Sequence, residues 1–170
     1  MKYQCAGILQ KDTGFNLSMN GQKEIVEFFE SRGLLINFIE TEKSTASSQE
    51  AASVIGCRID EIAKSIVFDV EGKAALILLE GDKKVDIEKL EKTLGSKVKK
   101  ADPSFIVQKT GFEAGGVAPV VKENMQIFID KGVMKHEFVW ISAGSRTAVI
   151  KLDTKGLDKA LNAEIISISC

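Results

Sequence analysis

The stretch SIVFDVEGKAALILL, from Ser65 to Leu79, decides how this chain folds. Two near-continuous apolar runs, Ser65 to Val70 and Ala74 to Leu79, flank the dipeptide Glu71-Gly72. Short apolar runs on either side of a turn signal are typical of paired strands, and the lack of strict apolar–polar alternation indicates burial on both faces. We therefore predict a β-hairpin that is buried on both sides.

The segments around this hairpin show helical and strand patterns in irregular order. Apolar periodicity, capping residues and glycine stops predict helices at Gln22–Arg32, from Ser47 to Gly56, from Asp86 to Gly95, after Asp102-Pro103, and after Asp153. Apolar runs predict further strands at Leu34–Ile39, Met125–Ile129, Phe138–Ser142, Thr147–Leu152 and Glu164–Ile168. Because strands and helices do not alternate strictly, we expect an α+β fold, a single domain with a central mixed β-sheet flanked by helices.

Length and composition fit one soluble globular domain. The chain has 170 residues, of which 44% are hydrophobic and 28% charged. Residues 1–20 show no clear period, and we expect them to form an N-terminal extension to a domain spanning 21–170. Net charge is −1, which argues against a broad cationic surface for nucleic acid. Lysines are frequent between Lys83 and Lys100, but acids are interleaved with them, which predicts a solvated face.

Cysteine usage and hydropathy indicate a cytoplasmic protein. The cysteines, Cys5, Cys57 and Cys170, are odd in number, widely spaced and without a CxxC pair. That pattern fits a reducing compartment and neither a disulfide framework nor a zinc site. The N-terminus lacks the apolar core of a signal peptide, and no apolar run approaches membrane-spanning length. We therefore expect no membrane contact, no metal and no other cofactor.

Conventional catalytic motifs are absent from the sequence. His136 is the only histidine, and its polar surroundings, Met134-Lys135-His136-Glu137, predict an exposed turn. Around Ser145 the chain reads Ala143-Gly144-Ser145-Arg146-Thr147, which is not a nucleophile elbow. No zinc-binding, Walker or dinucleotide-binding pattern occurs. The sequence thus argues against a histidine-dependent triad and against a catalytic transition metal.

Lys64 and two small-residue loops remain as candidates for chemistry. Lys64 lies between the amphipathic run Arg58–Ala63 and the apolar run that begins at Ser65. Gly115 and Gly116 permit close backbone approach, and successive N–H groups there would bind ligand oxygens. The second loop reads Ser142-Ala143-Gly144. On spacing alone, the pattern favours a surface lysine at a helix end and a structural glycine turn.

Four segments together resemble the YbaK/prolyl-tRNA synthetase-associated domain family. They are Ser47–Phe68, Gly81–Leu94, Ala101–Pro119 and Val139–Leu152, in the order in which the family has them. The combination of AKSIVF, GDKKVD and TGFEAGGVAP carries the resemblance, which extends from roughly Gln22 onward. The family comprises free-standing and inserted domains that hydrolyse mischarged aminoacyl-tRNA. Its members act without a conventional nucleophile, since hydroxyls of the terminal adenosine or the substrate's own side chain assist the attack.

The resemblance implies roles for particular residues. The family's essential lysine corresponds to Lys64 and its glycine loop to Gly115 and Gly116, which makes these three the catalytic candidates. The implied substrate-binding positions are Ser65, Gly111, Ala118, Ser142, Ala143 and Gly144. Ala118 and Ala143 replace a serine and a glycine that are common among relatives, and these departures border the expected amino-acid pocket. They leave the substrate amino acid open.

The activity implied by the resemblance is trans-editing: hydrolysis of the ester in mischarged aminoacyl-tRNA, with mischarged tRNA-Pro as the expected substrate. The expected partner is the acceptor end of the tRNA, with an aminoacyl-tRNA synthetase as a second candidate and with no role for DNA. The same pocket would also suit a non-catalytic module that holds aminoacyl-tRNA, or a small-molecule esterase. The sequence does not separate these alternatives.

Overall fold

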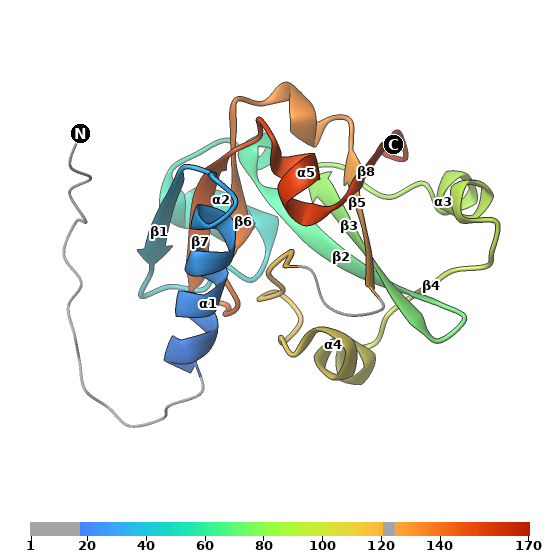
Figure 1. The fold of residues 1–170 in the computed structure, drawn as a ribbon, viewed down its shortest axis with the longest axis horizontal. Helices are drawn as coiled ribbons and strands as arrows, with labels where there is room; N and C mark the ends of the chain where they lie inside the picture. The colour runs from blue at the N-terminus through green and yellow to red at the C-terminus, as the bar shows by residue number, and fades with distance from the viewer. Residues whose placement is uncertain (1–17, 121–124) are drawn as a thin grey trace.

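The structure, a computed structural model, describes residues 18–120 and 125–170 as an α+β domain (Figure 1). The expected extension, residues 1–20, lies outside this description except for the backbone that begins the first helix. The helices are α1 (Ser18–Glu30), α2 (Ser48–Ile55), α3 (Ile87–Leu94), α4 (Pro103–Thr110) and α5 (Leu157–Leu161), with 3₁₀ turns η1 (Ile59–Glu61) and η2 (Val133–Lys135). The strands are β1 (Ile36–Glu40), β2 (Ala63–Val70), β3 (Lys73–Glu80), β4 (Lys99–Lys100), β5 (Met125–Asp130), β6 (Phe138–Ser142), β7 (Ala148–Asp153) and β8 (Glu164–Ile166).

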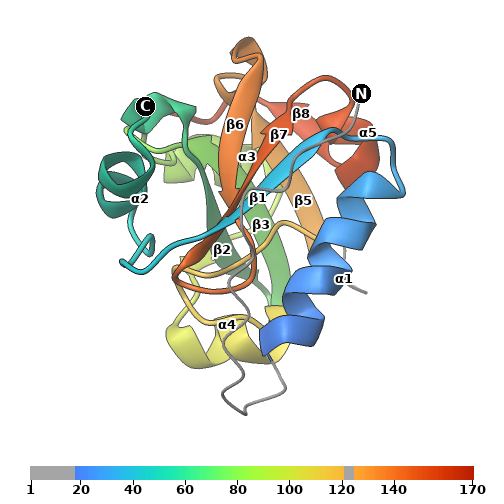
Figure 2. The same cartoon turned by 90° about the vertical axis from the view of Figure 1, so that its left-hand side faces the viewer.

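The described strands form two sheets. The predicted hairpin is present as β2 and β3, which pair antiparallel with Val70 opposite Lys73. β3 pairs parallel with β5, and β5 with β8, so a mixed sheet of order β4-β2-β3-β5-β8 results. β1, β7 and β6 form a second, antiparallel sheet, which crosses in front of β2, β3 and β5 in Figure 2. The expected mixed sheet is confirmed, and the separate three-stranded sheet is an addition to it.

The hairpin has two apolar faces, and one of them forms a core with the three-stranded sheet. On one face Leu76 and Leu78 belong to the same buried cluster as Ile150 of β7. On the other face Ile77 is buried with Leu90 of α3. All five side chains are fully buried, so the predicted burial on both faces is confirmed for β3. β2 is partly exposed, which leaves room for a site along it.

Capping residues set the ends of α2 as the sequence predicts. The Ser47 hydroxyl accepts a hydrogen bond from the Glu50 amide at 3.2 Å, and the Glu50 carboxylate accepts one from the Ser47 amide at 2.9 Å. This reciprocal pair is a capping box, and the Ser47 contact lowers the pKa of the Glu50 carboxyl. Gly56 ends the helix in the left-handed conformation, with φ of 77°. The start of α2 is therefore fixed, and it borders the site described below.

Two other predicted caps are present and one is wrong. Asp86 and Asp102 accept hydrogen bonds at the starts of α3 and α4. Asp153 does not cap α5, because its carboxylate instead accepts from the Lys155 amide at 2.9 Å in a tight turn. α5 begins after Gly156, which is left-handed. None of the helices in the described residues is both long and apolar enough to cross a membrane.

Candidate functional site

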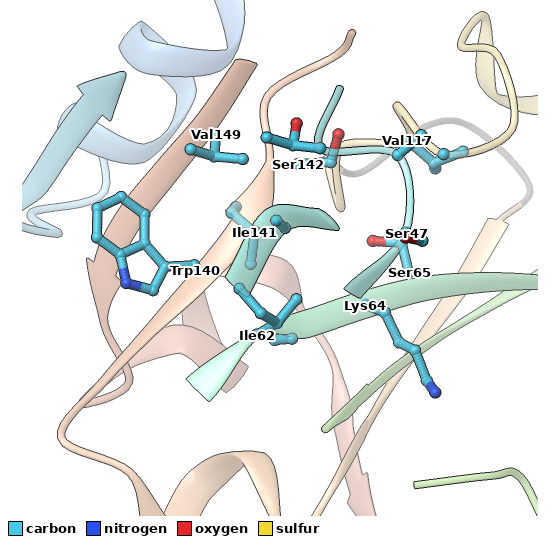
Figure 3. A pocket seen from close by; sticks show the side chains of 14 residues that line it. Ser47, Ile62, Lys64, Ser65, Val117, Trp140, Ile141, Ser142 and Val149 are labelled. Carbon is cyan, nitrogen blue, oxygen red and sulfur yellow. The ribbon is translucent and has the colours of Figure 1, made fainter. Parts of the chain in front are cut away.

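A small cavity lies where β2 of the mixed sheet meets β6 and β7 of the three-stranded sheet. Its volume is about 60 Å³, and Figure 3 shows its lining. The lining residues are Thr45, Ala46, Ser47, Ala51, Ile62, Ala63, Lys64, Ser65, Gly115, Val117, Trp140, Ile141, Ser142 and Val149. They combine small and apolar side chains with several hydroxyl groups. No histidine, cysteine or carboxylate belongs to this set of described residues.

One wall is the segment between β1 and α2, which runs along the loop that joins β6 to β7. The Thr45 amide donates to the Arg146 carbonyl at 2.7 Å, and the Thr45 hydroxyl donates to the same oxygen at 3.0 Å. Thr41 makes the same double contact with the Thr147 carbonyl, at 2.8 and 2.9 Å. These bonds fix Ala46 and Ser47 at the mouth of the cavity.

The glycine loop that follows α4 forms a second wall. Gly115 has a φ of 86°, and a Cβ there would lie 2.9 Å from the Cβ of Ala46. A Cβ on Gly116 would lie 2.9 Å from the Ser145 backbone carbon. Only glycine therefore fits between these segments. The Gly116 amide already donates to the Glu113 carbonyl at 2.9 Å, so it is not one of the free ligand-binding N–H groups that the sequence suggested.

Ser65 presents its hydroxyl on the cavity side of β2. Its Oγ is buried and has no hydrogen-bond partner among the described residues. An unpartnered buried hydroxyl costs free energy, because water has been removed without replacement. On the far side of the cavity, the Ser142 hydroxyl donates to the Ser145 carbonyl at 3.3 Å. Ser65 is thus the cavity group with unused capacity to bind a ligand.

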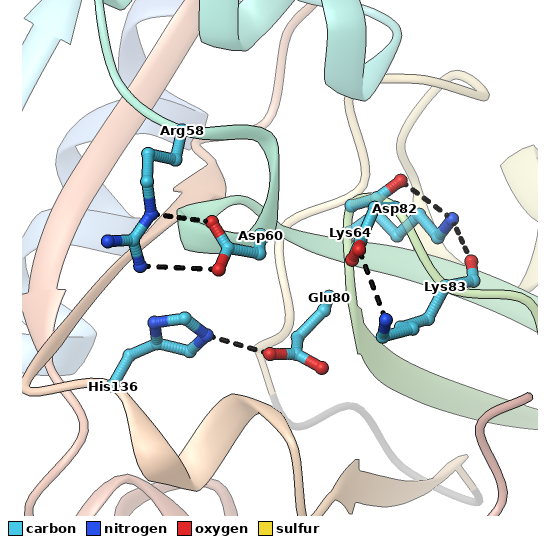
Figure 4. Close-up of polar contacts among 8 residues, drawn as sticks. Arg58, Asp60, Lys64, Glu80, Asp82, Lys83 and His136 are labelled. Atoms are coloured by element: carbon cyan, nitrogen blue, oxygen red, sulfur yellow. Dashed lines mark hydrogen bonds and ion pairs between the residues drawn. The ribbon is translucent and has the colours of Figure 1, made fainter.

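Lys64 points away from the cavity. In Figure 3 its side chain leaves β2 on the side opposite Ser142 and Val117, as strand alternation requires. Its ammonium donates to the carbonyl of Gly81 at 3.1 Å and to that of Lys83 (Figure 4). Burial lowers the pKa of Lys64, an effect that Asp82 opposes. The expectation of a surface lysine at a helix end is wrong, because Lys64 is the second residue of a strand.

The remaining predicted site residues support the loops and are not in the cavity lining. Gly111 ends α4 with φ of 77°. Ala118 and Ala143 are buried in the shared core, and the Ala143 amide donates to the Ala148 carbonyl at 2.9 Å. Gly144 packs against α1, since a Cβ there would lie 2.7 Å from Ile25 Cδ1. Of the nine predicted positions, Lys64, Ser65, Gly115 and Ser142 belong to the cavity lining, and of these Lys64 directs its side chain away from the cavity (Figure 3).

Several lining residues were not predicted. Thr45 and Ala46 lie in a segment that the sequence shows only as a connection before the α2 cap. Trp140 and Ile62 form a bridge between β6 and the start of β2, which no local pattern reveals. The alternation along β6 places Trp140 and Ser142 on one face, and this was the one available signal.

His136 is not the exposed turn residue that was expected. Its Nε2 lies 2.8 Å from Glu80 Oε1, and the two side chains are 12% and 13% exposed. Arg58 and Asp60 form an ion pair nearby, with 2.9 Å between Nε and Oδ1 (Figure 4). Neither pair is part of the cavity lining. Among the described residues, no group of three or more His, Cys, Asp or Glu side chains is arranged to hold a metal.

These features define a class of protein. It is an α+β domain with a small cavity that hydroxyl groups help to line, and with a lysine on the opposite face of the strand that borders the cavity. Residues 42–160 match the family described as the aminoacyl-tRNA editing domain. The chain belongs to this aminoacyl-tRNA editing family. The family expected from the sequence is thereby confirmed.

Sequence relatives agree with this assignment. The uncharacterized protein YwhH of Bacillus subtilis (strain 168) is 34% identical over 122 residues, which are 71% of this chain and 78% of YwhH. A proline–tRNA ligase of Staphylococcus aureus (strain MRSA252) is 30% identical over 99 residues, which are 58% of this chain but 17% of the ligase. The similarity to the ligase thus concerns a small part of that enzyme.

Solved structures show the same fold. The hypothetical protein APE2540 superposes with a TM-score of 0.81 and 26% identity, covering 86% of this chain and 99% of the other. A candidate trans-editing enzyme for prolyl-tRNA synthetase superposes with a TM-score of 0.78 and 27% identity, covering 88% of this chain and 97% of the other. The α+β architecture is therefore shared with these solved structures.

Proposed function

We propose that this protein is a free-standing hydrolase that removes a wrong amino acid from the 3′ end of a tRNA. The single observation that carries the proposal is the arrangement on β2, where two consecutive residues place their polar groups on opposite faces of the strand. The unpartnered Ser65 hydroxyl faces the cavity, and the Lys64 ammonium lies at the opposite face. In an editing domain, the aminoacyl group would enter the cavity, the terminal ribose would lie at its mouth, and the phosphate would reach Lys64 around the edge of β2, where β4 pairs only with Phe68 and Asp69.

The size of the cavity sets the kind of amino acid. Pockets for drug-sized ligands measure roughly 300–1,000 Å³, whereas this cavity has about 60 Å³. Ala46, Ala51 and Ala63 form part of its lining, and the Gly115 loop closes against Ala46. We therefore infer a small side chain on the substrate. A bulky residue would require the loops to separate.

Water is the nucleophile in this proposal, and positioning supplies most of the rate. Among the described residues, the cavity lining offers no histidine, cysteine or carboxylate to act as a general base. A hydroxyl of the terminal ribose would assist attack on the ester carbonyl, as the family resemblance implies. Lys64 keeps one of its three N–H donors beyond those bound to Gly81 and Lys83. That donor would bind an oxygen of the terminal phosphate on the opposite face of β2 and stabilise its negative charge, which would position the ester at the cavity.

The tRNA and the partner follow from the relatives. Similarity to part of a proline–tRNA ligase and to a candidate trans-editing enzyme for prolyl-tRNA synthetase supports mischarged tRNA-Pro as the substrate. A synthetase that releases such tRNA is the corresponding partner, and the cytoplasm is the corresponding compartment. Translation fidelity is the process that this activity would serve.

Deacylation of a panel of mischarged tRNAs tests the proposal. Single-turnover release of alanine, serine, cysteine and a bulky control such as phenylalanine should be measured on tRNA-Pro and on a second tRNA. We expect hydrolysis of small residues on tRNA-Pro and little release of phenylalanine. Tight binding of the charged tRNA without faster hydrolysis would identify a non-catalytic binding module instead. Hydrolysis of simple amino-acid esters with no preference for tRNA would identify a small-molecule esterase.

A further inference from the structure

The lysine-rich stretch between Lys83 and Lys100 contains a subset of lysines that no acid neutralises. Four lysines of this stretch form ion pairs with nearby carboxylates. These pairs are Lys83–Asp82 at 3.2 Å, Lys89–Asp86 at 3.5 Å, Lys97–Glu91 at 2.7 Å and Lys99–Asp69 at 3.7 Å. Within the part of the chain that the structure describes, Lys84, Lys92 and Lys100 have no such partner. The solvated, charge-balanced face expected from the sequence therefore has exceptions.

Two of these exceptions belong to segments that adjoin the Lys64 face of β2. Lys100 of β4 is directly opposite Phe68 of β2, and opposed residues in antiparallel strands share a face. Phe68 and Lys64 are four residues apart on β2, so they also share that face. Lys84 follows Lys83, whose carbonyl accepts a hydrogen bond from the Lys64 ammonium. Both Lys84 and Lys100 are exposed.

The backbone around Lys84 is fixed from two directions. The Lys84 amide donates to the Cys170 carbonyl at 3.3 Å, and the Cys170 amide donates to the Lys84 carbonyl at 3.0 Å. The buried Asp130 carboxylate accepts from the amides of Ile168 and Ser169 at 2.9 and 3.0 Å, which holds the C-terminal segment in place. Lys84 therefore projects from a rigid loop and not from a freely moving one.

Several positively charged side chains in one region favour the binding of an anion. After the larger effect of burial, the charges of Lys100 and Lys84 also lower the pKa of Lys64, while Asp82 raises it. An anion placed among Lys64, Lys84 and Lys100 would relieve their mutual repulsion, and lysine binds phosphate as a point charge without reading sequence.

We propose that Lys84 and Lys100 bind phosphodiesters of the single-stranded 3′ end of the tRNA, next to the phosphate at Lys64. This inference rests on the proposed function for the identity of the anion. It assigns the face of β2 opposite the cavity, beside the loop 81–84, as the path by which the RNA strand leaves the site. The contact would be small, in keeping with the net charge of −1.

The test measures how binding to an acceptor-stem RNA hairpin depends on salt. The hairpin carries the unpaired 3′ end and no attached amino acid. Fluorescence anisotropy should give the slope of log affinity against log salt for the wild type and for the double variant Lys84→Gln/Lys100→Gln. Each phosphate contact on a single strand contributes about 0.7 to the slope. The double variant should therefore have a slope smaller by about 1.4, and Lys92→Gln should leave it unchanged. Lys84→Arg/Lys100→Arg should restore the wild-type slope, because the charge is kept.

The outcomes separate this inference from the proposed function. A wild-type slope in the double glutamine variant overturns the inference, even if mischarged tRNA is hydrolysed normally. An equal loss of slope in Lys92→Gln also overturns it, since it would show diffuse attraction without a defined path. The predicted slopes without any deacylation in the hydrolysis assay would support the RNA path and refute the hydrolase. Thermal unfolding of each variant should match the wild type, because the substituted side chains are exposed.

Discussion

Lys64 and Ser65 are adjacent in sequence and occupy opposite environments. The Lys64 ammonium donates to the Gly81 and Lys83 carbonyls on one face of β2. The Ser65 hydroxyl is buried against the cavity on the other face and has no partner among the described residues. One face therefore satisfies a charge with backbone oxygens, while the other leaves a neutral polar group unsatisfied.

This difference shows how one strand serves two purposes. Side chains alternate across a strand, so consecutive residues point to opposite faces. A site that must hold a small side chain and a phosphate needs an enclosed neutral space and an open cationic one. Under the proposed function, the pair Lys64-Ser65 would supply both. Substitutions on the two faces should accordingly have different effects.

Lys64→Ala should have the largest effect. If the remaining N–H donor of Lys64 binds the terminal phosphate more tightly in the transition state than in the ground state, its loss should lower the single-turnover rate about 10²–10³-fold, or about 2.7–4 kcal/mol. Hydrolysis of mischarged tRNA-Pro under enzyme excess is the measurement, with circular dichroism and thermal unfolding as checks on folding. Lys92→Ala is the matched control, because Lys92 lies on α3 and is not part of the cavity lining. A folded Lys64→Ala protein with the wild-type rate would remove Lys64 from the mechanism.

Gly115→Ala should have the next largest effect, through the shape of the cavity. A left-handed backbone costs an L-residue about 1–2 kcal/mol, and at Gly115 the new Cβ would also meet Ala46 at 2.9 Å. Gly111→Ala is the matched control, because its φ of +77° is similar but no atom lies within 4 Å of the new Cβ. Denaturant unfolding should show the larger loss for Gly115→Ala, accompanied by a loss of activity. Equal losses in the two variants would show that the contact with Ala46 yields freely.

The sequence predicts the scaffold well because its signals are local. The hairpin, the Ser47–Glu50 capping box and the Asp86 cap each depend on a few neighbouring residues, and the structure shows all three. Burial of the hairpin on both faces is confirmed for β3, while β2 is partly exposed. The prediction that Asp153 caps α5 was wrong, because its carboxylate instead accepts a hydrogen bond from the Lys155 amide in an Asx-type turn.

The site was only partly predictable because it is made of distant segments. The cavity joins Thr45 and Ala46 to Gly115 and Ser142, contacts that appear only when the two sheets pack. His136 was misplaced for the same reason, since its partner Glu80 lies 56 residues away. Family resemblance identified Lys64 as a site residue, but the direction of its side chain depends on the register of β2.

Ser65→Ala should separate binding from stability on the cavity face. Removing a buried hydroxyl that has no partner should leave the free energy of unfolding unchanged or raise it slightly, because the desolvation cost disappears. If the hydroxyl binds the substrate, the loss of one hydrogen bond worth about 0.5–1.5 kcal/mol should lower kcat/KM by about 2–12-fold. Ser142→Ala, which breaks a bond to the Ser145 carbonyl, offers a comparison. Reduced stability with full activity would indicate that Ser65 is structural.

The smallest effect is expected from removing the histidine and all three cysteines. Cys57 and Cys170 are free thiols, burial raises the pKa of the Cys57 thiol, and neither residue belongs to the cavity lining. His136 contacts Glu80 outside the cavity, so His136→Gln, whose amide retains a donor at a similar position, should preserve that contact. A variant with His136→Gln and all three cysteines replaced by serine should hydrolyse mischarged tRNA within about twofold of the wild-type rate, since positioning and charge carry the reaction. The decisive control is His136→Gln alone, measured by single turnover at several pH values. A loss of more than tenfold in a stably folded His136→Gln protein, together with a missing pH-dependent limb, would place the base at His136 and move the chemistry away from both faces of β2.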